Sequence, residues 1–305
     1  MATVPQATWR RSWVVENLVS ALRASAQVLR QDRFALVGAL IYLFFLLVAI
    51  FAPYIAPYDP QVIVTDEAGN WMVNQKPSAK FLLGTTNVGR DIFSQLVYGA
   101  RAALLVGFTA ALAVAIIGTV VGLIAGYYGG IVDTILMRIT DIAFGIPFLP
   151  LVIVLVAFLK PSIWNTVAAM ALLLWRDSGR VIRSQVLTVR ERSFVEAARV
   201  SGASDLRIMF LYIAPNILPL SFLYGSLAIG WAILTEASVS FLGFGDPNTI
   251  SWGYMLQDAY VSQAMARQAY YWFIPPGLCI MLTVMAGFFI GRGFEEVLFP
   301  RLQRQ

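Results

Sequence analysis

The sequence predicts an all-α polytopic membrane protein with six transmembrane helices and an external segment between the first two of them. Composition gives the first observation, because 59% of the 305 residues are hydrophobic and only 13% are charged, about half the charge of a typical soluble domain. The second observation is a set of uncharged runs of membrane-spanning length. The third is the uneven distribution of lysine and arginine among the connections.

The uncharged runs define the helices. Five of them contain 18 to 28 residues each: 34–52, 102–125, 142–159, 208–235 and 268–291. These lengths are close to or above the ~20 residues that cross a hydrocarbon core as a helix. A shorter run of 15 residues, 161–175, reaches this length only if its helix continues through the Arg/Asp-bearing turn that follows. Six spans place both termini on one side of the membrane.

Basic residues assign that side to the cytoplasm. Sixteen of the 22 lysines and arginines lie on the side of the termini or at its membrane edge, and lysine and arginine in short connections favour the cytoplasmic side. The net charge of +5 is dispersed among the spans. The sequence also lacks the pattern of basic and aromatic residues that is typical of a nucleic-acid-binding groove. We therefore expect no nucleic-acid partner.

Residues 1–33 predict a cytoplasmic segment rather than a cleaved signal, because no small-residue cleavage site precedes a short apolar core. Four apolar residues recur at near-helical spacing: Val15, Leu18, Leu22 and Leu29. This pattern favours an amphipathic helix on the inner membrane surface, with a frayed tail as the alternative. Residues 294–305 are expected to form a cytoplasmic C-terminal tail.

Residues 34–98 are expected to hold the first span and the external segment. Prolines at 53, 57 and 60 end the first helix. A turn within 65–74 lies between short β-prone stretches and predicts a small hairpin. At 83–96 we expect a short helix along the outer surface, capped by a residue of 85–87.

Small residues and prolines predict how the helices pack and bend. Gly118 and Gly122 have the four-residue spacing that lets two membrane helices approach closely. Residues 126–130 predict a tight turn after the second span. Two proline pairs are expected to bend the third and fifth spans: Pro147 with Pro150, and Pro215 with Pro219.

The residue types exclude several function classes. The chain has no histidine and one cysteine, Cys279, so we expect no disulfide within the chain and no His/Cys metal site. An intramembrane enzyme would lack acid–base residues, since no span holds paired carboxylates, and no catalytic residue is assigned. The sequence also contains no Gly-x-x-x-x-Gly-Lys-Ser/Thr phosphate cradle. The chain is therefore not itself an ATPase.

A polar segment between the fourth and fifth spans has the composition of a protein-binding helix. One helical face carries a large residue among small ones: Phe194, Ala197, Ala198 and Ser201. Gly202 can end this helix in a left-handed conformation, and Ser204 and Asp205 can cap the next one. From these residues alone, an ordinary amphipathic inner loop is an equal alternative.

Within this segment, Glu196-Ala-Ala is followed after a gap of three residues by Gly202-Ala-Ser, and Pro215 comes thirteen residues after the glycine. This pattern resembles the EAA loop of ABC-importer permeases. Further stretches resemble the C-type subunit of the dipeptide and oligopeptide permease family: LGTTNVGRD at 83–91, AGYYGG at 125–130, MRITD at 137–141, LTEASVSFLGFG at 234–245 and SWG at 251–253. The resemblance covers the chain from about residue 34 to residue 302.

The resemblance implies the type I ABC-importer permease fold, with a core of five helices at 99–293. It implies a coupling helix near 193–205 that docks into a cleft of a cytoplasmic ATPase subunit, with these contact residues: Phe194, Glu196, Ala197, Ala198, Arg199, Gly202, Ala203, Ser204 and Asp205. The implied partners are a second permease subunit (a heterodimer is the family expectation), two ATPase subunits that use ATP and magnesium, an extracytoplasmic solute-binding protein and membrane lipid. The chain itself is expected to bind no cofactor and to lie in a bacterial or archaeal inner membrane.

Glu236 is the main candidate for the solute pathway, because an unpaired carboxylate within a membrane costs several kcal/mol. Solute contact or gating is one role, and a structural pair with Arg90 or Arg101, which we favour, is the other. The remaining pathway or gating candidates are Arg90, Trp231 and Pro215. Two other carboxylates are expected in local inner-edge pairs: Asp141 with Arg138, and Asp177 with Arg176 or Arg180.

The leading hypothesis is a permease subunit that imports peptides or similarly sized oligomeric solutes, with oligosaccharides or another solute as the alternative. The sequence departs from the family pattern at two places. At 212–215, Tyr-Ile-Ala-Pro replaces the common Ile-x-Leu-Pro. The external stretch at 61–80 is longer than in the simplest peptide permeases, so the identity of the solute is left undecided. An ion-coupled carrier would need several carboxylates at the membrane centre and an inverted repeat. The sequence contains one such carboxylate and no convincing repeat.

Overall fold

The computed structural model describes residues 32–298. Most of the expected amphipathic N-terminal segment and the last seven residues lie outside this range. Within it all regular secondary structure is helical, and the β features are two isolated bridges, Thr65–Trp71 and Thr85–Asp91. The all-α prediction is confirmed for the described residues. The expected hairpin at 65–74 is a turn closed by one bridge rather than a pair of strands.

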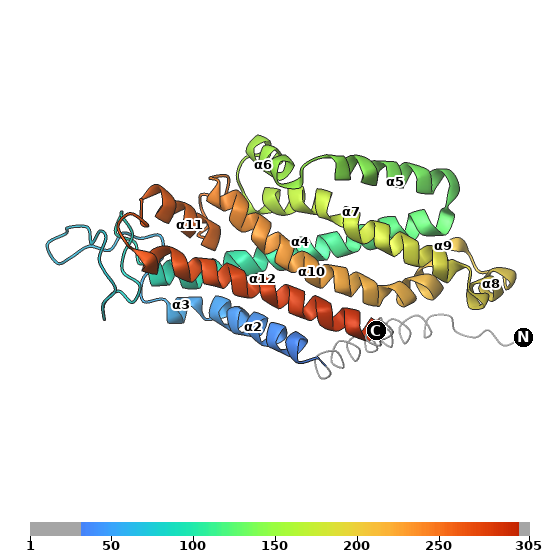
Figure 1. Ribbon diagram of the computed structural model, residues 1–305, viewed down its shortest axis with the longest axis horizontal. Helices are drawn as coiled ribbons and strands as arrows, with labels where there is room; N and C mark the ends of the chain where they lie inside the picture. Colours follow the sequence, from blue (N-terminus) through green and yellow to red (C-terminus); the bar gives the residue numbers. More distant parts are fainter. Residues whose placement is uncertain (1–31, 299–305) are drawn as a thin grey trace, which may run out of the picture.

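Five long helices lie roughly along the long axis of the molecule (Figure 1). They are α2 (Arg33–Ile50), α4 (Ile92–Tyr128), α7 (Ile163–Arg190), α10 (Ala214–Phe241) and α12 (Tyr270–Leu298). Shorter helices occupy the connections: α3 (Ala52–Ile55), α5 (Gly130–Gly145), α6 (Phe148–Leu159), α8 (Ser193–Val200), α9 (Asp205–Arg207), the π-helix η1 (Ile208–Ile213) and α11 (Trp252–Val261).

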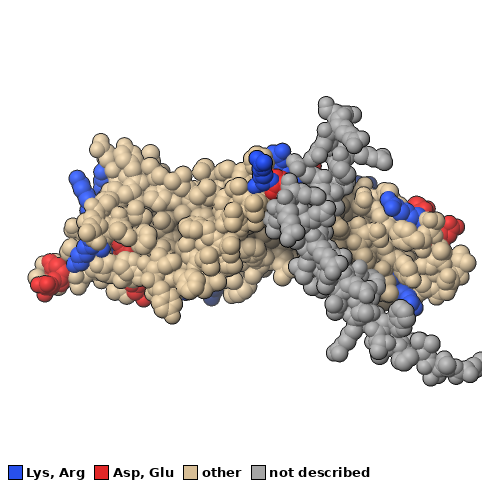
Figure 2. All heavy atoms as spheres, turned by 90° about the horizontal axis from the view of Figure 1, so that it is seen from below, with Lys and Arg blue, Asp and Glu red and all other residues tan. Residues whose placement is uncertain are grey.

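Within residues 32–298, four helices are long and apolar enough to cross a membrane: Arg33–Ile50, Ile92–Tyr128, Asp205–Phe241 and Tyr270–Glu295. The bent pair of α5 and α6 would make a fifth span. Helix α7 has 28 residues, about 42 Å at 1.5 Å per residue, but it carries three arginines and an aspartate in its second half. Figure 2 shows a broad, almost uncharged surface beside the charged left-hand end. A sixth span through α7 stays a prediction.

The uncharged run at 142–159 is not one helix, so this predicted span is wrong in its boundaries. Helix α5 ends at Gly145, and α6 begins at Phe148 after a bend of 92°. Pro147 causes the break, because proline disfavours the α conformation of the residue before it, and Ile146 is extended. The predicted bend is therefore confirmed, although it separates two helices instead of curving one.

The start of α4 also differs from the prediction. No separate helix forms at 83–91, and α4 begins at Ile92 and runs for 37 residues without interruption. Asp91 is its N-cap, and its Oδ2 accepts a hydrogen bond from the Ser94 backbone N–H at 2.8 Å. The preceding residues fold into a turn in which Thr86 Oγ1 accepts from the Arg90 N–H at 3.1 Å. Asp91 satisfies an otherwise unpaired helix donor, as an N-cap should, whereas residues 85–87 serve the turn.

Helices α4 and α7 pack through a seam of small residues. A Cβ on Gly118 would lie 2.0 Å from Ser178 Oγ, one on Gly122 2.6 Å from the Gly179 carbonyl oxygen, and one on Gly126 2.7 Å from Val186 Cβ. The three glycines are four residues apart and so share one helix face. The predicted close approach at Gly118 and Gly122 is confirmed, and it continues for another turn.

At the other end of α4, Trp252 of α11 fastens the helix to its neighbours. This indole is 1% exposed, and its Nε1 donates to the Leu96 carbonyl oxygen at 2.9 Å. Gly99 leaves the room that the ring needs, because a Cβ there would lie 2.5 Å from Trp252 Cδ1. Phe45 of α2 packs edge-on against the same ring, with 5.2 Å between centroids.

Enlarging the centre of the seam should destabilise the protein. We expect Gly122→Leu to lower folding stability by at least ~1–3 kcal/mol, the usual range for overpacking, because backbone atoms of α7 block the new side chain. Thermal unfolding of the purified protein in detergent measures the change. Gly145→Leu is the control, since nothing lies within 4 Å of a Cβ at Gly145. Equal Tm values for the two variants would contradict the conclusion that close packing of α4 against α7 excludes a side chain at position 122.

Candidate functional site

The segment of residues 193–207, which we call the coupling segment, lies at the end of the molecule opposite the 56–91 loops and α11 (Figure 1). Its helix, α8, forms as predicted and ends in a Schellman motif. The Gly202 N–H donates to the Arg199 carbonyl at 3.0 Å and the Ala203 N–H donates to the Ala198 carbonyl at 3.1 Å. Gly202 has φ +77°, the left-handed conformation that favours glycine at this position.

Only two side chains anchor α8 to the rest of the protein by burial. Val195 is fully buried and Ala198 is 7% exposed. Both belong to a hydrophobic cluster with Ile208, Met209 and residues of α4, α7 and α10. The other described side chains of α8 are exposed, including the predicted contact residues Glu196, Ala197 and Arg199.

The predicted contact face lines a groove of about 410 Å³. The structure brings together the four residues assigned to one face with two further predicted contacts from the turn and two residues of the next helices: Phe194, Ala197, Ala198 and Ser201 with Gly202 and Ala203, and Arg207 and Tyr212. Periodicity could not identify Arg207 and Tyr212, because they belong to the next two helices. The glycine turn folds these helices back beside α8, so the groove has an alanine-lined wall and a basic residue along its edge.

The capping prediction for the next helix is only half right. Ser204 occupies the N-cap position of α9, but its side chain forms no capping hydrogen bond. Asp205 is the first helical residue, and its Oδ1 accepts a hydrogen bond from the Tyr127 hydroxyl at 2.6 Å. Tyr127 lies near the C-terminus of α4, so the carboxylate joins two helices instead of capping its own.

Arg190, close to the coupling segment, closes the end of α4. Its Nη1 donates to the carbonyl oxygens of Gly126 at 2.9 Å and Tyr127 at 3.2 Å. A cation at this position satisfies carbonyls that lack a helical partner and stabilises the negative end of the helix dipole. Sequence motifs did not indicate this role, because Arg190 is 63 residues from Tyr127 in the chain.

Pro215 follows an irregular part of the fifth predicted span. Residues 208–213 form a π-helix, and Pro215 is then in the first turn of α10, where its missing N–H does no harm. Short π-helical stretches often mark functional positions in helices. Pro215 and Glu236 are 21 residues apart, roughly 30 Å along a helix, so these two candidates do not share a site.

Glu236 is buried, but the expected pair with Arg90 or Arg101 is wrong. The residue is 7% exposed, and its Oε1 accepts a hydrogen bond from the Ser240 hydroxyl at 2.6 Å. Arg101 instead donates through Nε to the Ala49 carbonyl at 2.6 Å. Arg90 lies toward Asp258 of α11, and its charge opposes the rise that burial causes in the pKa of that carboxyl. Serine hydroxyls can satisfy a buried carboxylate without an ion pair.

The surroundings of Glu236 form a small closed cavity of about 10 Å³, near the lower limit for one water molecule. Its lining combines two carboxylates with hydroxyl side chains: Glu236, Asp246, Thr166, Ser240, Thr249 and Ser251. Ser251 is the N-cap of α11, and Asp246 accepts from the Ile163 N–H at the start of α7 at 3.3 Å. The cavity therefore lies where α7, α10 and α11 meet. Trp231, which is 50% exposed, does not line it.

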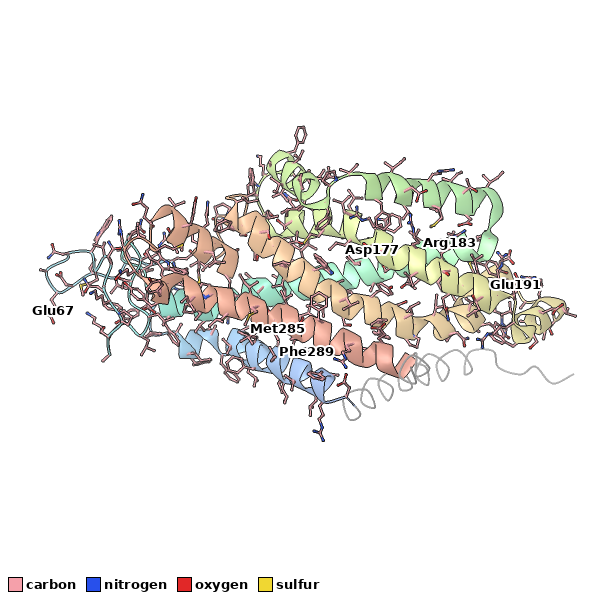
Figure 3. All side chains as sticks on the ribbon, in the orientation of Figure 1. Glu67, Asp177, Arg183, Glu191, Met285 and Phe289 are labelled. Atoms are coloured by element: carbon pink, nitrogen blue, oxygen red, sulfur yellow. The ribbon has the colours of Figure 1, made fainter. Side chains whose placement is uncertain are left out.

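Ion pairs connect the exposed helix α5 to α7. The expected local pairs are present, with Arg138 Nη1 at 3.9 Å from Asp141 and Arg176 Nε at 3.8 Å from Asp177. The shorter contact of Asp141 is with Arg180, at 2.5 Å. Sequence reasoning missed the bidentate pair of Arg183 with Asp133. Figure 3 shows Asp177 and Arg183 on α7 and then Glu191, just after its end, in order toward the coupling segment.

Models of two known protein families match this chain. Residues 118–304 match the model of the binding-protein-dependent transport system inner membrane component. Residues 20–77 match the model of the N-terminal TM domain of oligopeptide transport permease C. The first match includes the coupling segment, and the second includes α2 and part of the 56–91 loops.

Curated relatives are similar over nearly their whole length. The dipeptide transport system permease protein DppC of Alkalihalophilus pseudofirmus is 38% identical over 286 residues, 93% of this chain and 91% of the relative. The protein of the same name from Haemophilus influenzae is 38% identical over 90% of this chain and 93% of its own. The glutathione transport system permease protein GsiD of Pectobacterium atrosepticum is 36% identical over 88% and 87%. The chain is thus a multi-pass membrane protein that belongs to the ABC-importer permease family of binding-protein-dependent transport system inner membrane components.

Proposed function

We propose that this permease forms half of the pathway through which an ATP-driven importer moves peptides or similar oligomeric solutes. The coupling segment carries the proposal, because it is a short, exposed helix at one end of the molecule with a groove of small side chains. The similar proteins named for dipeptide and glutathione transport support the peptide class, since glutathione is itself a tripeptide.

Energy comes from ATPase partners in this proposal. Helix α8 follows α7 after two residues and leads through α9 and η1 into α10. A displacement of α8 by a docked ATPase subunit would therefore move both long helices. The ATPase subunits use ATP and magnesium, while this chain binds neither, and Phe194, Glu196 and Arg199 contact the ATPase cleft.

The full importer contains a second permease subunit, which we propose to be a different chain, two ATPase subunits and an extracytoplasmic solute-binding protein. In this proposal α7 is the fourth of six spans, so both termini and the coupling segment lie on one side of the membrane, the cytoplasmic side. The distribution of basic residues supports this orientation. The 56–91 loops and α11, at the other end, then face the solute-binding protein.

Two other functions have less support. Oligosaccharides or another solute could use the same architecture, because the binding protein selects the solute in such systems. An ion-coupled carrier needs carboxylates that exchange ions within the membrane. Among the described residues, Glu236 is the buried carboxylate of the candidate spans, and its hydrogen bonds to serine favour a structural role.

Changes in the coupling segment should separate insertion from energy coupling. We expect Gly202→Val and Glu196→Lys to leave the protein inserted but to abolish solute-stimulated ATP hydrolysis in the reconstituted importer. The valine is incompatible with the left-handed turn, and the lysine reverses a charge at the edge of the contact. ATP hydrolysis and solute uptake are both measured in proteoliposomes.

Glu295→Lys is the matched charge reversal, at an exposed position of α12 outside both the coupling segment and the 56–91 loops. It should keep stimulated hydrolysis. Uptake at the normal rate by the Gly202→Val and Glu196→Lys importers would rule out the coupling role of this segment.

The solute class can be tested through the binding protein. We expect di- to oligopeptides to raise the Tm of the cognate solute-binding protein by several degrees, since a ligand that binds only the folded state stabilises it by mass action. A thermal-shift screen should include oligosaccharides of similar size as the comparison set. If oligosaccharides alone raised the Tm of the binding protein, the transported solutes would be oligosaccharides and not peptides.

A further inference from the structure

The Tyr127 hydroxyl is a polar link between the coupling segment and a helix that is not adjacent to it in sequence. It donates to Asp205 Oδ1 at 2.6 Å, and the Arg199 guanidinium also lies beside it. Tyr127 itself is 8% exposed. A hydrogen bond to a carboxylate is directional and about twice as strong as one between neutral groups.

The position of Tyr127 is fixed by α4 and α7. Arg190 of α7 binds the last carbonyls of α4, and Gly129 ends the helix with φ +66°. One residue before Tyr127, Gly126 packs against Val186. The hydroxyl therefore belongs to the rigid seam of α4 and α7 rather than to a free helix end.

Burial alone would hold α8 loosely. Its two buried residues, Val195 and Ala198, make apolar contacts, and such contacts do not fix a direction. Asp205 follows the glycine turn directly, so the bond to Tyr127 fixes the orientation of the turn and hence the angle of α8 to α4.

Helix α4 extends from this bond to the far end of the molecule. Its 37 residues span about 55 Å. At its other end Leu96 and Gly99 hold Trp252 of α11. A movement of the coupling segment that pulls on Asp205 would act on a continuous rod that ends beside α11 (Figure 1).

We propose that Tyr127 is a positioning residue that latches the coupling segment to α4, so that movement of α8 reaches the opposite end of the protein through α4 as well as through α7 and α10. This inference rests on the proposed coupling function. It assigns to Tyr127 no contact with solute or nucleotide.

The test compares two neighbouring tyrosines in the complete importer, reconstituted with its ATPase subunits, partner permease and binding protein. Tyr127→Phe removes the hydroxyl but keeps the buried ring. Tyr128→Phe is the matched control, because Tyr128 is 49% exposed and the described contacts of its side chain include a ring contact and no hydrogen bond. We expect Tyr127→Phe to raise the number of ATP molecules hydrolysed per solute imported by roughly three- to tenfold, the range that loss of one partly solvated hydrogen bond supports. The control should keep the normal ratio.

Variants of the acceptor test whether the bond itself matters. Asp205→Ala should raise the number of ATP molecules hydrolysed per solute as Tyr127→Phe does. Asp205→Asn keeps an acceptor oxygen, so it should retain most of the coupling. The double variant Tyr127→Phe/Asp205→Ala should be no worse than either single change, since both remove the same interaction. Additive effects would show that the residues act separately and would overturn the latch.

Co-purification of the ATPase subunits distinguishes this proposal from the coupling function on which it rests. With the latch as proposed, Tyr127→Phe retains the ATPase subunits and the normal Tm but loses efficiency. An unchanged ratio in Tyr127→Phe, alongside uncoupled Gly202→Val, would refute the latch and leave the coupling function standing. Normal coupling in all of these variants, Gly202→Val included, would refute both.

Discussion

The contact between α4 and α7 is the constraint on which the rest of the molecule depends. Gly118, Gly122 and Gly126 leave no space for side chains, so the two backbones approach closely over about two turns and gain dispersion contacts along this stretch. Apolar surface alone drives little association between helices in lipid, because the hydrocarbon chains are equally apolar. Close fit must therefore set the spacing, and the seam provides it. The halves of α4 and α7 nearest the coupling segment form one unit to which the other helices attach.

Each end of this unit has its own polar fastening. At the 56–91 end, Trp252 of α11 donates to a carbonyl of α4 in the space left by Gly99. At the coupling end, Arg190 and the Tyr127–Asp205 bond connect α4 with α7 and with the start of α9. Helix α5 differs from this pattern, since ion pairs and aromatic contacts of arginine hold it to α7.

This division of the molecule fits the family of the chain. An importer permease has to transmit a movement from one membrane face to the other, and a rigid pair of helices with hydrogen-bonded ends suits that task. The coupling segment is small and mostly exposed, so its surface is available for another protein. Glu236 accepts a hydrogen bond from Ser240 of its own helix and lines a small cavity with Ser251, the N-cap of α11. Its burial by itself does not indicate a solute site.

Local sequence determined the all-α class, the apolar spans, the close approach at Gly118, the break at Pro147 and the glycine turn at 202. Each of these follows from properties of a few neighbouring residues: length without charge, absence of a Cβ, or a missing N–H. Only the tertiary structure decided the partners of the charged residues. Arg101 donates a hydrogen bond to a carbonyl of α2, Asp205 accepts one from Tyr127, and Arg183 forms an ion pair with Asp133. A long side chain can reach several groups, and the backbone distances that select one of them are set by packing between segments 50 or more residues apart.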